Sequence, residues 1–367
     1  MRVETPSWAF ADSGTRFGIF RQTGAAKTIE QKLEDAAEVH RVTGICPTVA
    51  VHVLWDFPDG FDPKLVGFAD GLGVRIGAIN PTLFQDQCYK YGSLAHPDRT
   101  IRRQAVDHVV NSIKLAKQTG SRHISVWLAD GTNYPGQDSI ADRRNRLIET
   151  FGEIHRQLTP EMTLLIEYKP FEPAFYHTDI GDWGMSLLLC RHAGPQARVL
   201  VDIGHHYQGQ NVEQIVSWLL AEKMLGGFHF NDRRYADDDL TTGSIDPYQV
   251  FRIFHEIITA RSGAGEPPIA YMVDQAHNVK LKIEAMIQTV DFIHQLFAKA
   301  LLVDRSSLRN AQMNRQVLDA ECFLQDAFLT DTRPLIGYVR RQMGLAPDAL
   351  QAYRDGGYQH KIESTRK

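Results

Sequence analysis

Short apolar runs alternate with longer amphipathic stretches along most of this 367-residue chain. The apolar runs have the length of strands, and the segments between them repeat their apolar residues at helical spacing. The predicted strands cover residues 7–10, 48–55, 74–79, 123–128, 163–168, 199–202, 227–231 and 269–274. The predicted helices cover residues 28–42, 63–72, 98–119, 139–158, 183–192, 212–223, 247–259 and 280–300. Gly44 and Gly120 follow two of these helices, and Ser139 and Asn211 precede two others, as stop and start signals do.

Eight strand-and-helix units in about 300 residues predict a (β/α)8 barrel of the TIM type. The strands are almost continuously apolar, which is typical of a parallel sheet covered on both faces. A doubly wound sheet is the rival fold. It needs a Gly-rich phosphate turn after an early strand, and the segment SGTRFG at 13–18 is not one. We therefore expect a single catalytic barrel over residues 1–300.

Residues 301–367 have a different character, because their segments are helix-like and contain no β-branched run. This part predicts a C-terminal helical extension of the barrel. We expect it to form an arm that packs on the barrel or on a neighbouring subunit.

The composition excludes several classes of protein. A formal net charge of −4 gives no electrostatic footprint for nucleic acid, and no apolar run reaches membrane-spanning length. The N-terminus lacks the basic and then apolar layout of a signal peptide. Four cysteines without a Cys-x-x-Cys spacing suit a reducing compartment and argue against a zinc ribbon or a disulfide scaffold. We expect a cytoplasmic protein that binds neither nucleic acid nor membrane.

Polar residues cluster where the last four predicted strands end. In a TIM barrel the functional residues gather at the C-terminal ends of the strands, so these side chains should share one mouth. They are Glu167, Lys169, Asp202, His205, His229, Asp237, Asp238, Asp239 and Asp274. Each alone has a plainer interpretation, as a helix cap, a loop hydrogen-bonding group or a solvated acidic turn. Their recurrence at four successive strand ends favours a functional site.

The charge balance of this mouth indicates metal ions. Without Asp238, five carboxylates, two imidazoles and one lysine converge on this partly dry pocket, and they are costly unless cations balance them. Two divalent ions that share one bridging carboxylate would nearly neutralise the set. Oxygen and imidazole ligands without a thiolate favour Mn²⁺, with Mg²⁺ or Co²⁺ as alternatives.

Four motifs carry a family resemblance: IEYKP at 166–170, VDIGHH at 201–206, HFND at 229–232 followed by DDD at 237–239, and VDQAHN at 273–278. With them, residues 5–295 resemble the xylose-isomerase-like barrels, and within that group the L-rhamnose isomerases of the broad-specificity bacterial type. The resemblance implies a structural and a catalytic metal ion bridged by Asp202. The implied structural ligands are Glu167, Asp202, His229 and Asp274, and the other catalytic ligands are His205, Asp237 and Asp239.

The resemblance also implies substrate contacts. His52 matches the family's strand-two histidine, and Trp127 matches its substrate-stacking tryptophan. Trp55 stands where xylose isomerases proper have an aspartate, so His52 either opens the sugar ring or only binds a substrate oxygen. Phe17 matches an aromatic residue that a neighbouring subunit adds to the pocket, and a homotetramer is implied in the same way.

Two divalent ions beside a lysine suit a substrate with adjacent oxygens, such as an aldose in its open-chain form. Lys169 would stabilise negative charge at O1, and Asp239 or Asp237 would take a proton while hydrogen passes from C2 to C1 as a hydride. The candidates for a water-excluding wall are Trp127, Trp55, Trp8, Phe84 and Phe57. The sequence therefore predicts a metal-dependent aldose–ketose isomerase acting on L-rhamnose or a related sugar.

Three other functions fit parts of the pattern. A ketose 3-epimerase shares the Glu, Asp, His set with one metal, but normally ends strand eight in glutamate rather than Asp274. A barrel endonuclease with several zinc ions would need more histidine ligands and a basic face. A non-catalytic metal-binding barrel would not need Lys169 beside the ligands.

Overall fold

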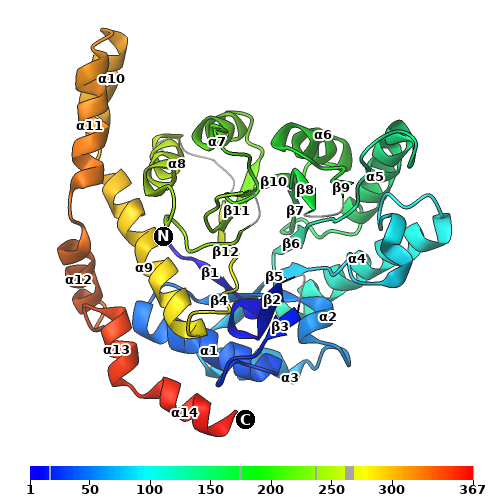
Figure 1. Ribbon diagram of the computed structural model, residues 1–367, viewed down its shortest axis with the longest axis horizontal. Helices are drawn as coiled ribbons and strands as arrows, with labels where there is room; N and C mark the ends of the chain where they lie inside the picture. Colours follow the sequence, from blue (N-terminus) through cyan, green and yellow to red (C-terminus); the bar gives the residue numbers. More distant parts are fainter. Residues whose placement is uncertain (16–17, 173–175, 236–237, 261–267, 367) are drawn as a thin grey trace.

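The computed structural model describes residues 1–15, 18–172, 176–235, 238–260 and 268–366. Its centre is a closed barrel of eight parallel strands, and helices surround the strands (Figure 1). Around the barrel the strands are β1 (Glu4–Pro6), β12 (Ala270–Val273), β11 (Leu225–Phe230), β10 (Ala197–Asp202), β7 (Thr163–Glu167), β6 (His123–Val126), β5 (Arg75–Asn80) and β4 (Thr48–His52). The predicted (β/α)8 barrel is confirmed.

The outer layer consists of helices that follow the strands. They are α1 (Ile29–Thr43), α2 (Val53–Asp56), α3 (Lys64–Gly71), α4 (Arg99–Thr119), α5 (Ile140–His155), α6 (Trp183–Ala193), α7 (Val212–Ala221), α8 (Pro247–Ala260) and α9 (Lys282–Leu301). The described loops also contain the 3-10 helices η1 (Ser7–Phe10) and η2 (Gln87–Tyr91) and two small antiparallel sheets. In these sheets β2 (Ser13–Thr15) pairs with β3 (Gly18–Phe20), and β8 (Phe171–Glu172) pairs with β9 (Tyr176–His177).

The helix boundaries follow the expected capping chemistry. Ser139 and Asn211 accept hydrogen bonds from backbone N–H groups in the first turns of α5 and α7. Gly44 and Gly120 end α1 and α4 with φ of 75° and 72°, a backbone conformation that costs glycine little.

The first strand is three residues earlier than predicted, at Glu4–Pro6, and the apolar segment Ser7–Phe10 is a 3-10 helix. This strand was not predicted because it begins with the polar residue Glu4 and so is not an apolar run. The Glu4 carboxylate points into the barrel and accepts a hydrogen bond from Ala78 N at 2.9 Å. The space that it fills exists because Gly77 has no side chain there.

The predicted strand 48–55 is also too long, because β4 ends at His52 and residues Val53–Asp56 form the helical turn α2. The Asp56 carboxylate folds back and accepts a hydrogen bond from His52 N at 2.7 Å. The same carboxylate accepts bonds from Ser7 Oγ and Lys32 Nζ, both at 2.6 Å. A buried carboxylate with three donors therefore ends the strand and turns Trp55 toward the barrel mouth.

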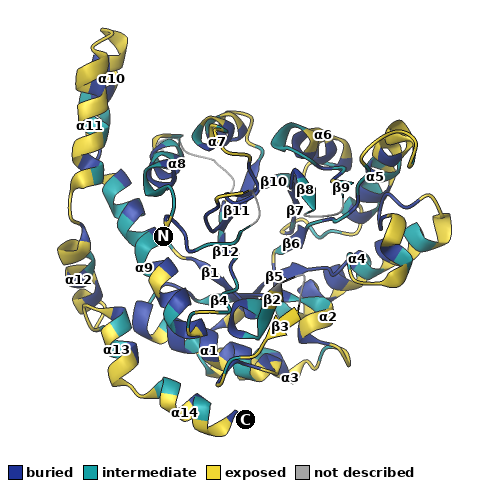
Figure 2. Ribbon diagram, viewed as in Figure 1, coloured by how far each residue is buried: buried dark blue, intermediate teal, exposed yellow. Residues whose placement is uncertain are grey.

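Apolar side chains fill the space between barrel and helices, where the strands are almost entirely buried (Figure 2). A second, small apolar cluster occupies the barrel interior and consists of Ala50, Ala78, Leu165, Leu200 and Met272. Because this interior is packed, a cavity can open only at the ends of the barrel.

Five helices form the C-terminal arm: α10 (Arg305–Met313), α11 (Val317–Leu329), α12 (Arg333–Gln342), α13 (Ala349–Asp355) and α14 (Tyr358–Thr365). The arm runs along one side of the barrel (Figure 1), and α13 packs against α1 and α9. The pair α10 and α11 projects beyond the barrel and is largely exposed (Figure 2). Within the described residues no single helix is long and apolar enough to span a membrane, although α9 and α10 pass that test together across a bend of 59°.

Candidate metal and substrate site

Four strand ends bring the predicted ligands together at the C-terminal mouth of the barrel. Glu167 ends β7, Asp202 ends β10, His229 lies within β11 and Asp274 follows β12 directly. One ligand atom from each of these four residues lies within 4.8 Å of the others. Since neighbouring parallel strands end at the same edge, the chain needs no further device to assemble this group.

A second group shares Asp202 with the first. Ligand atoms of Asp202, His205 and Asp239 also lie within 4.8 Å of one another. His205 is held on the turn after β10, where Asp202 Oδ1 accepts bonds from Gly204 N and His205 N. The structure thus places six of the seven predicted ligands in two groups bridged by Asp202. Asp237, the seventh, and Phe17 lie outside the described residues.

The carboxylates of the first group do not all find a hydrogen-bond donor within the group. His229 Nδ1 lies 3.2 Å from Glu167, 3.5 Å from Asp274 and 3.7 Å from Asp202. One N–H can satisfy only one of these three carboxylates, and the two longer distances exceed that of a good hydrogen bond. Ligand atoms that surround a common point at these distances fit a cation better than they fit one another.

The electrostatics of the mouth lead to the same conclusion. Burial raises the pKa of Asp202 to about 6 and also raises the pKa of Asp274. Burial alone would lower the pKa of His229, but the charges of Glu167, Asp274 and Asp202 outweigh it and raise this pKa to about 9. A proton on His229 therefore supplies part of the missing positive charge, and a divalent ion that replaced it would supply more.

Lys169 lies beside the ligands and is 4% exposed. Its ammonium forms an ion pair with Glu172 at 2.9 Å and lies 5.0 Å from the centre of the Trp127 ring. A buried lysine is costly unless it is paired, so Glu172 stabilises the charged form in this position. Sequence reasoning missed Glu172, because a glutamate three residues after Lys169 in a loop carries no distinctive signal.

A cavity of about 260 Å³ is lined by Lys169 and by five of the ligands: Glu167, His205, His229, Asp239 and Asp274. Four aromatic rings also line this cavity, those of Trp8, Trp55, Phe84 and Trp127. Adjacent rings meet edge to face, with centroids 4.9 Å apart for Phe84 and Trp127. Phe57, the fifth predicted wall residue, is instead buried in the core against Phe61, which corrects that prediction.

His52 lies in the aromatic wall, with its ring 4.0 Å from Trp55 and 4.9 Å from Trp8. The Trp55 indole donates a hydrogen bond to Gln85 at 2.9 Å. Burial lowers the pKa of His52 to about 3, so its imidazole is neutral at ordinary pH. Of the predicted substrate contacts, His52, Trp55, Trp127 and Lys169 all line the cavity.

The loop after β11 positions Asp239. An antiparallel bridge between Asp232 and Leu240, with two backbone hydrogen bonds of 2.9 Å, closes this loop. Asp239 adopts a φ of 45°, a left-handed conformation that aspartate tolerates better than most residues. Its neighbour Asp238 has another function, since it accepts hydrogen bonds from Arg234 N and Tyr235 N within the turn.

Two further residues hold the ligands in place. The Asn231 amide donates to both Asp202 oxygens at 3.0 and 3.1 Å and to Asp239 at 3.1 Å, so it links the two groups. Trp8 donates its indole N–H to Asp274 at 2.8 Å. Asn231 lies within the HFND motif, but only the structure shows that its side chain turns toward both acids.

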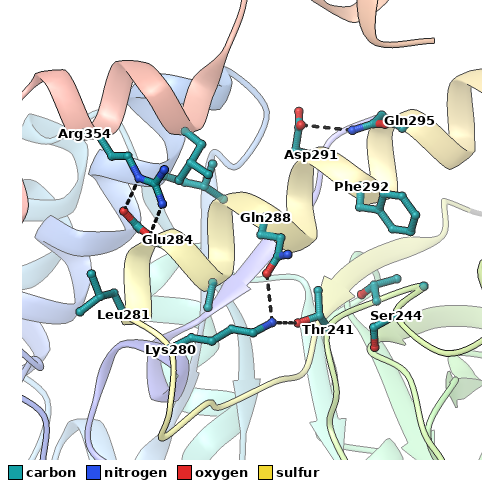
Figure 3. A pocket seen from close by; sticks show the side chains of 15 residues that line it. Thr241, Ser244, Lys280, Leu281, Glu284, Gln288, Asp291, Phe292, Gln295 and Arg354 are labelled. Carbon is teal, nitrogen blue, oxygen red and sulfur yellow. Dashed lines mark hydrogen bonds and ion pairs between the residues drawn. The ribbon is translucent and has the colours of Figure 1, made fainter. Parts of the chain in front are cut away.

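A larger hollow of about 550 Å³ lies elsewhere, between the loop at Thr241–Ser244, α9 and α13 (Figure 3). Its charged groups already have partners: Glu284 pairs with Arg354, and Lys280 donates hydrogen bonds to Thr241 and Gln288. None of the six ligand candidates that the structure describes lines it. The smaller cavity at the barrel mouth is therefore the candidate site.

Residues 26–259, more than half of the chain, match the family described as xylose isomerase-like TIM barrel. The chain belongs to this family. A probable sugar isomerase of Mesorhizobium japonicum is 40% identical over 370 residues, which cover 99% of this chain and 86% of that protein. A probable sugar isomerase of Rhizobium meliloti is 38% identical over 371 residues, with the same coverage of 99% and 86%.

Solved structures of other proteins share the barrel. An L-ribulose 3-epimerase superimposes with a TM-score of 0.60 at 13% identity and covers 85% of this chain and 97% of its own. A D-psicose 3-epimerase gives a TM-score of 0.58 at 13% identity, covering 81% and 99%. At such low identity the likeness establishes the fold alone.

Proposed function

We propose that this protein is a metal-dependent aldose–ketose isomerase that interconverts L-rhamnose and L-rhamnulose, or a related pair of sugars, by moving hydrogen between C1 and C2. The observation that carries the proposal is the pair of ligand groups sharing Asp202, with the buried Lys169 beside them in an aromatic-walled cavity. The sugar isomerases among the relatives support the general class of reaction.

Two divalent ions, Mn²⁺ above Mg²⁺ or Co²⁺, fit the donor set of carboxylate oxygens and imidazoles. Glu167, Asp202, His229 and Asp274 would hold one ion. Asp202, His205, Asp239 and Asp237 would hold the other. When bound, such ions act as Lewis acids that polarise a carbonyl and an adjacent hydroxyl oxygen.

The protein's own groups account for the remaining requirements. Lys169 is held charged by Glu172 and would stabilise the negative charge that develops on substrate O1. Asp239 would hold the proton that leaves O2 and return it at O1, while the hydrogen on C2 moves to C1 with its electron pair. Trp127, Trp55 and Phe84 exclude water from that transfer.

The first experiment measures ketose formation from a panel of aldoses, after chelation and again after Mn²⁺ is added. Asp239→Asn should lower turnover by roughly 10²–10³-fold, since it removes a charge at the reacting oxygens. Asp238→Asn is the matched control, because Asp238 lies in the same loop but bonds backbone N–H groups. Equal turnover in the two variants would contradict the role of Asp239.

A 3-epimerase reaction is tested by running turnover in D₂O. An epimerase removes a proton from carbon and replaces it from solvent, so deuterium would enter the product extensively. A hydride shift keeps the original hydrogen, and little deuterium should appear. The second ligand group, with His205 and Asp239, favours the isomerase.

A further inference from the structure

The hydrogen bonds around His52 determine which of its ring nitrogens carries the proton. His52 Nδ1 lies 3.3 Å from the Thr82 hydroxyl oxygen. That oxygen also accepts a hydrogen bond from Leu54 N, at 3.4 Å. Thr82 is 2% exposed, so its hydroxyl proton cannot turn to solvent.

The Thr82 hydroxyl has one proton to donate, and among the described residues His52 Nδ1 is its only acceptor. If Nδ1 carried a proton instead, the buried hydroxyl would face two donors and have no acceptor, which costs about 1–3 kcal/mol for an unsatisfied group. The arrangement in which every group is satisfied has Thr82 donating to Nδ1.

A hydrogen bond to helix α4 also fixes the backbone of Thr82. Its backbone N–H donates to His108 Nε2 on α4 at 3.0 Å. The rings of Trp8, Trp55 and Phe84 surround the His52 imidazole and limit its rotation. The neutral imidazole therefore carries its single proton on Nε2. No described residue accepts a hydrogen bond from this N–H, so it remains available to a molecule bound in the cavity that His52 lines.

We infer that Thr82 is a positioning residue that fixes His52 as a hydrogen-bond donor, so that His52 binds a substrate oxygen through Nε2–H and is not the base that opens the sugar ring. A neutral imidazole protonated on Nε2 has no lone pair there to accept a proton from the substrate. The inference deepens the proposed function and rests on it for the identity of the bound oxygen. The assignment of the proton rests on the hydrogen bonds alone.

Neutron diffraction from crystals of the full chain in D₂O tests that assignment without substrate or turnover. We expect deuterium on His52 Nε2, none on Nδ1, and a Thr82 hydroxyl deuterium directed at Nδ1. Deuterium on Nδ1, alone or together with Nε2, would overturn the inference even if the protein proved to be an isomerase.

Kinetics of two variants test the consequence. Thr82→Val should raise the KM for the aldose three- to tenfold and change kcat less than twofold, while Thr150→Val, which removes a buried hydroxyl on α5, leaves both constants unchanged. His52→Gln keeps a donor near Nε2 but cannot act as a base, so its kcat should fall less than tenfold.

A ring-opening base would instead lose roughly 10²–10⁴-fold in kcat in the His52→Gln variant, and that result would overturn the inference. A wild-type protein that turns over no aldose would refute the proposed function and leave the neutron result to decide the state of His52.

Discussion

Carboxylates at the barrel mouth and at the junction of the arm with the barrel differ in the charges that surround them. At the junction the buried Asp35 pairs with Arg366 at 2.7 Å, and the half-buried Asp291 pairs with Arg340 at 2.6 Å. At the mouth Glu167, Asp202 and Asp274 face one another and two imidazoles.

The carboxylates of the two regions have different effects on the stability of the fold. A paired acid contributes to holding two parts of the chain together, although its net contribution to stability is small. A cluster of like charges destabilises the fold until cations bind, and such a cluster is retained where it has a function. Substitutions should therefore reduce stability at the junction and activity at the mouth.

Breaking a junction pair should produce the largest loss of stability. Arg366→Met leaves the Asp35 carboxylate, which is almost fully buried, with the Tyr358 hydroxyl as its one remaining side-chain partner among the described residues. We expect the free energy of unfolding, measured in urea, to fall by about 3–5 kcal/mol. Arg333→Met, at the exposed pair with Asp331, is the control and should change the free energy of unfolding far less, because solvent screens that pair. Turnover per folded molecule should be unchanged in both variants.

Removing a metal ligand at the mouth should lower turnover and leave the stability of the metal-free protein unchanged or higher. Asp274→Asn keeps the acceptor for the Trp8 indole but removes a charge from the first ligand group. Turnover should fall by roughly 10²–10³-fold, while the melting temperature of the chelated protein stays the same or rises. Asp291→Asn at the junction should lower stability and leave turnover intact. A large loss of stability in chelated Asp274→Asn would contradict the comparison.

Metal ions should stabilise the folded protein only by binding to the ligands at the barrel mouth. Mn²⁺ at about 100 times its dissociation constant raises the free energy of unfolding by about 2.7 kcal/mol, because it binds the folded state alone. Thermal melting of the wild type and of Arg366→Met should show this rise, and Asp274→Asn should show less of it. An equal rise in all three proteins would place the ion elsewhere.

Acid should weaken the fold beside the junction through His294 on α9, which bonds the Met1 carbonyl. Burial lowers the pKa of His294 from 6.5 to about 4, so between these values the unfolded chain binds more protons than the folded protein. The stabilisation is complete above pH 6.5 and is lost as the pH falls. At pH 5 the loss is about 2 kcal/mol. His294→Gln keeps a donor for Met1 but cannot titrate, so its stability should change less between pH 7 and pH 5.

Much of the fold could be predicted because it depends on local pattern. Ser139 and Gly120 mark helix ends whatever the rest of the chain does, and β-branched runs such as 199–202 read as strands in isolation. The first strand could not be predicted, because Glu4 is polar and its burial depends on Gly77, which lies 73 positions along the chain. The length of β4 depended in the same way on Asp56.

For the site, the sequence by itself determined which residue types stand at the strand ends, and with them the acidic and imidazole composition of the mouth. Parallel strands deliver those side chains to one edge without further information. Only the tertiary structure decided the contacts between residues distant in sequence. These include the hydrogen bonds from Asn231 to Asp202, the contact of the Lys169 ammonium with the Trp127 ring, and the hydrogen bond between Thr82 and His52. The physical reason is that a hydrogen bond is directional and specific to two atoms, whereas the pattern along a chain records only polarity and spacing.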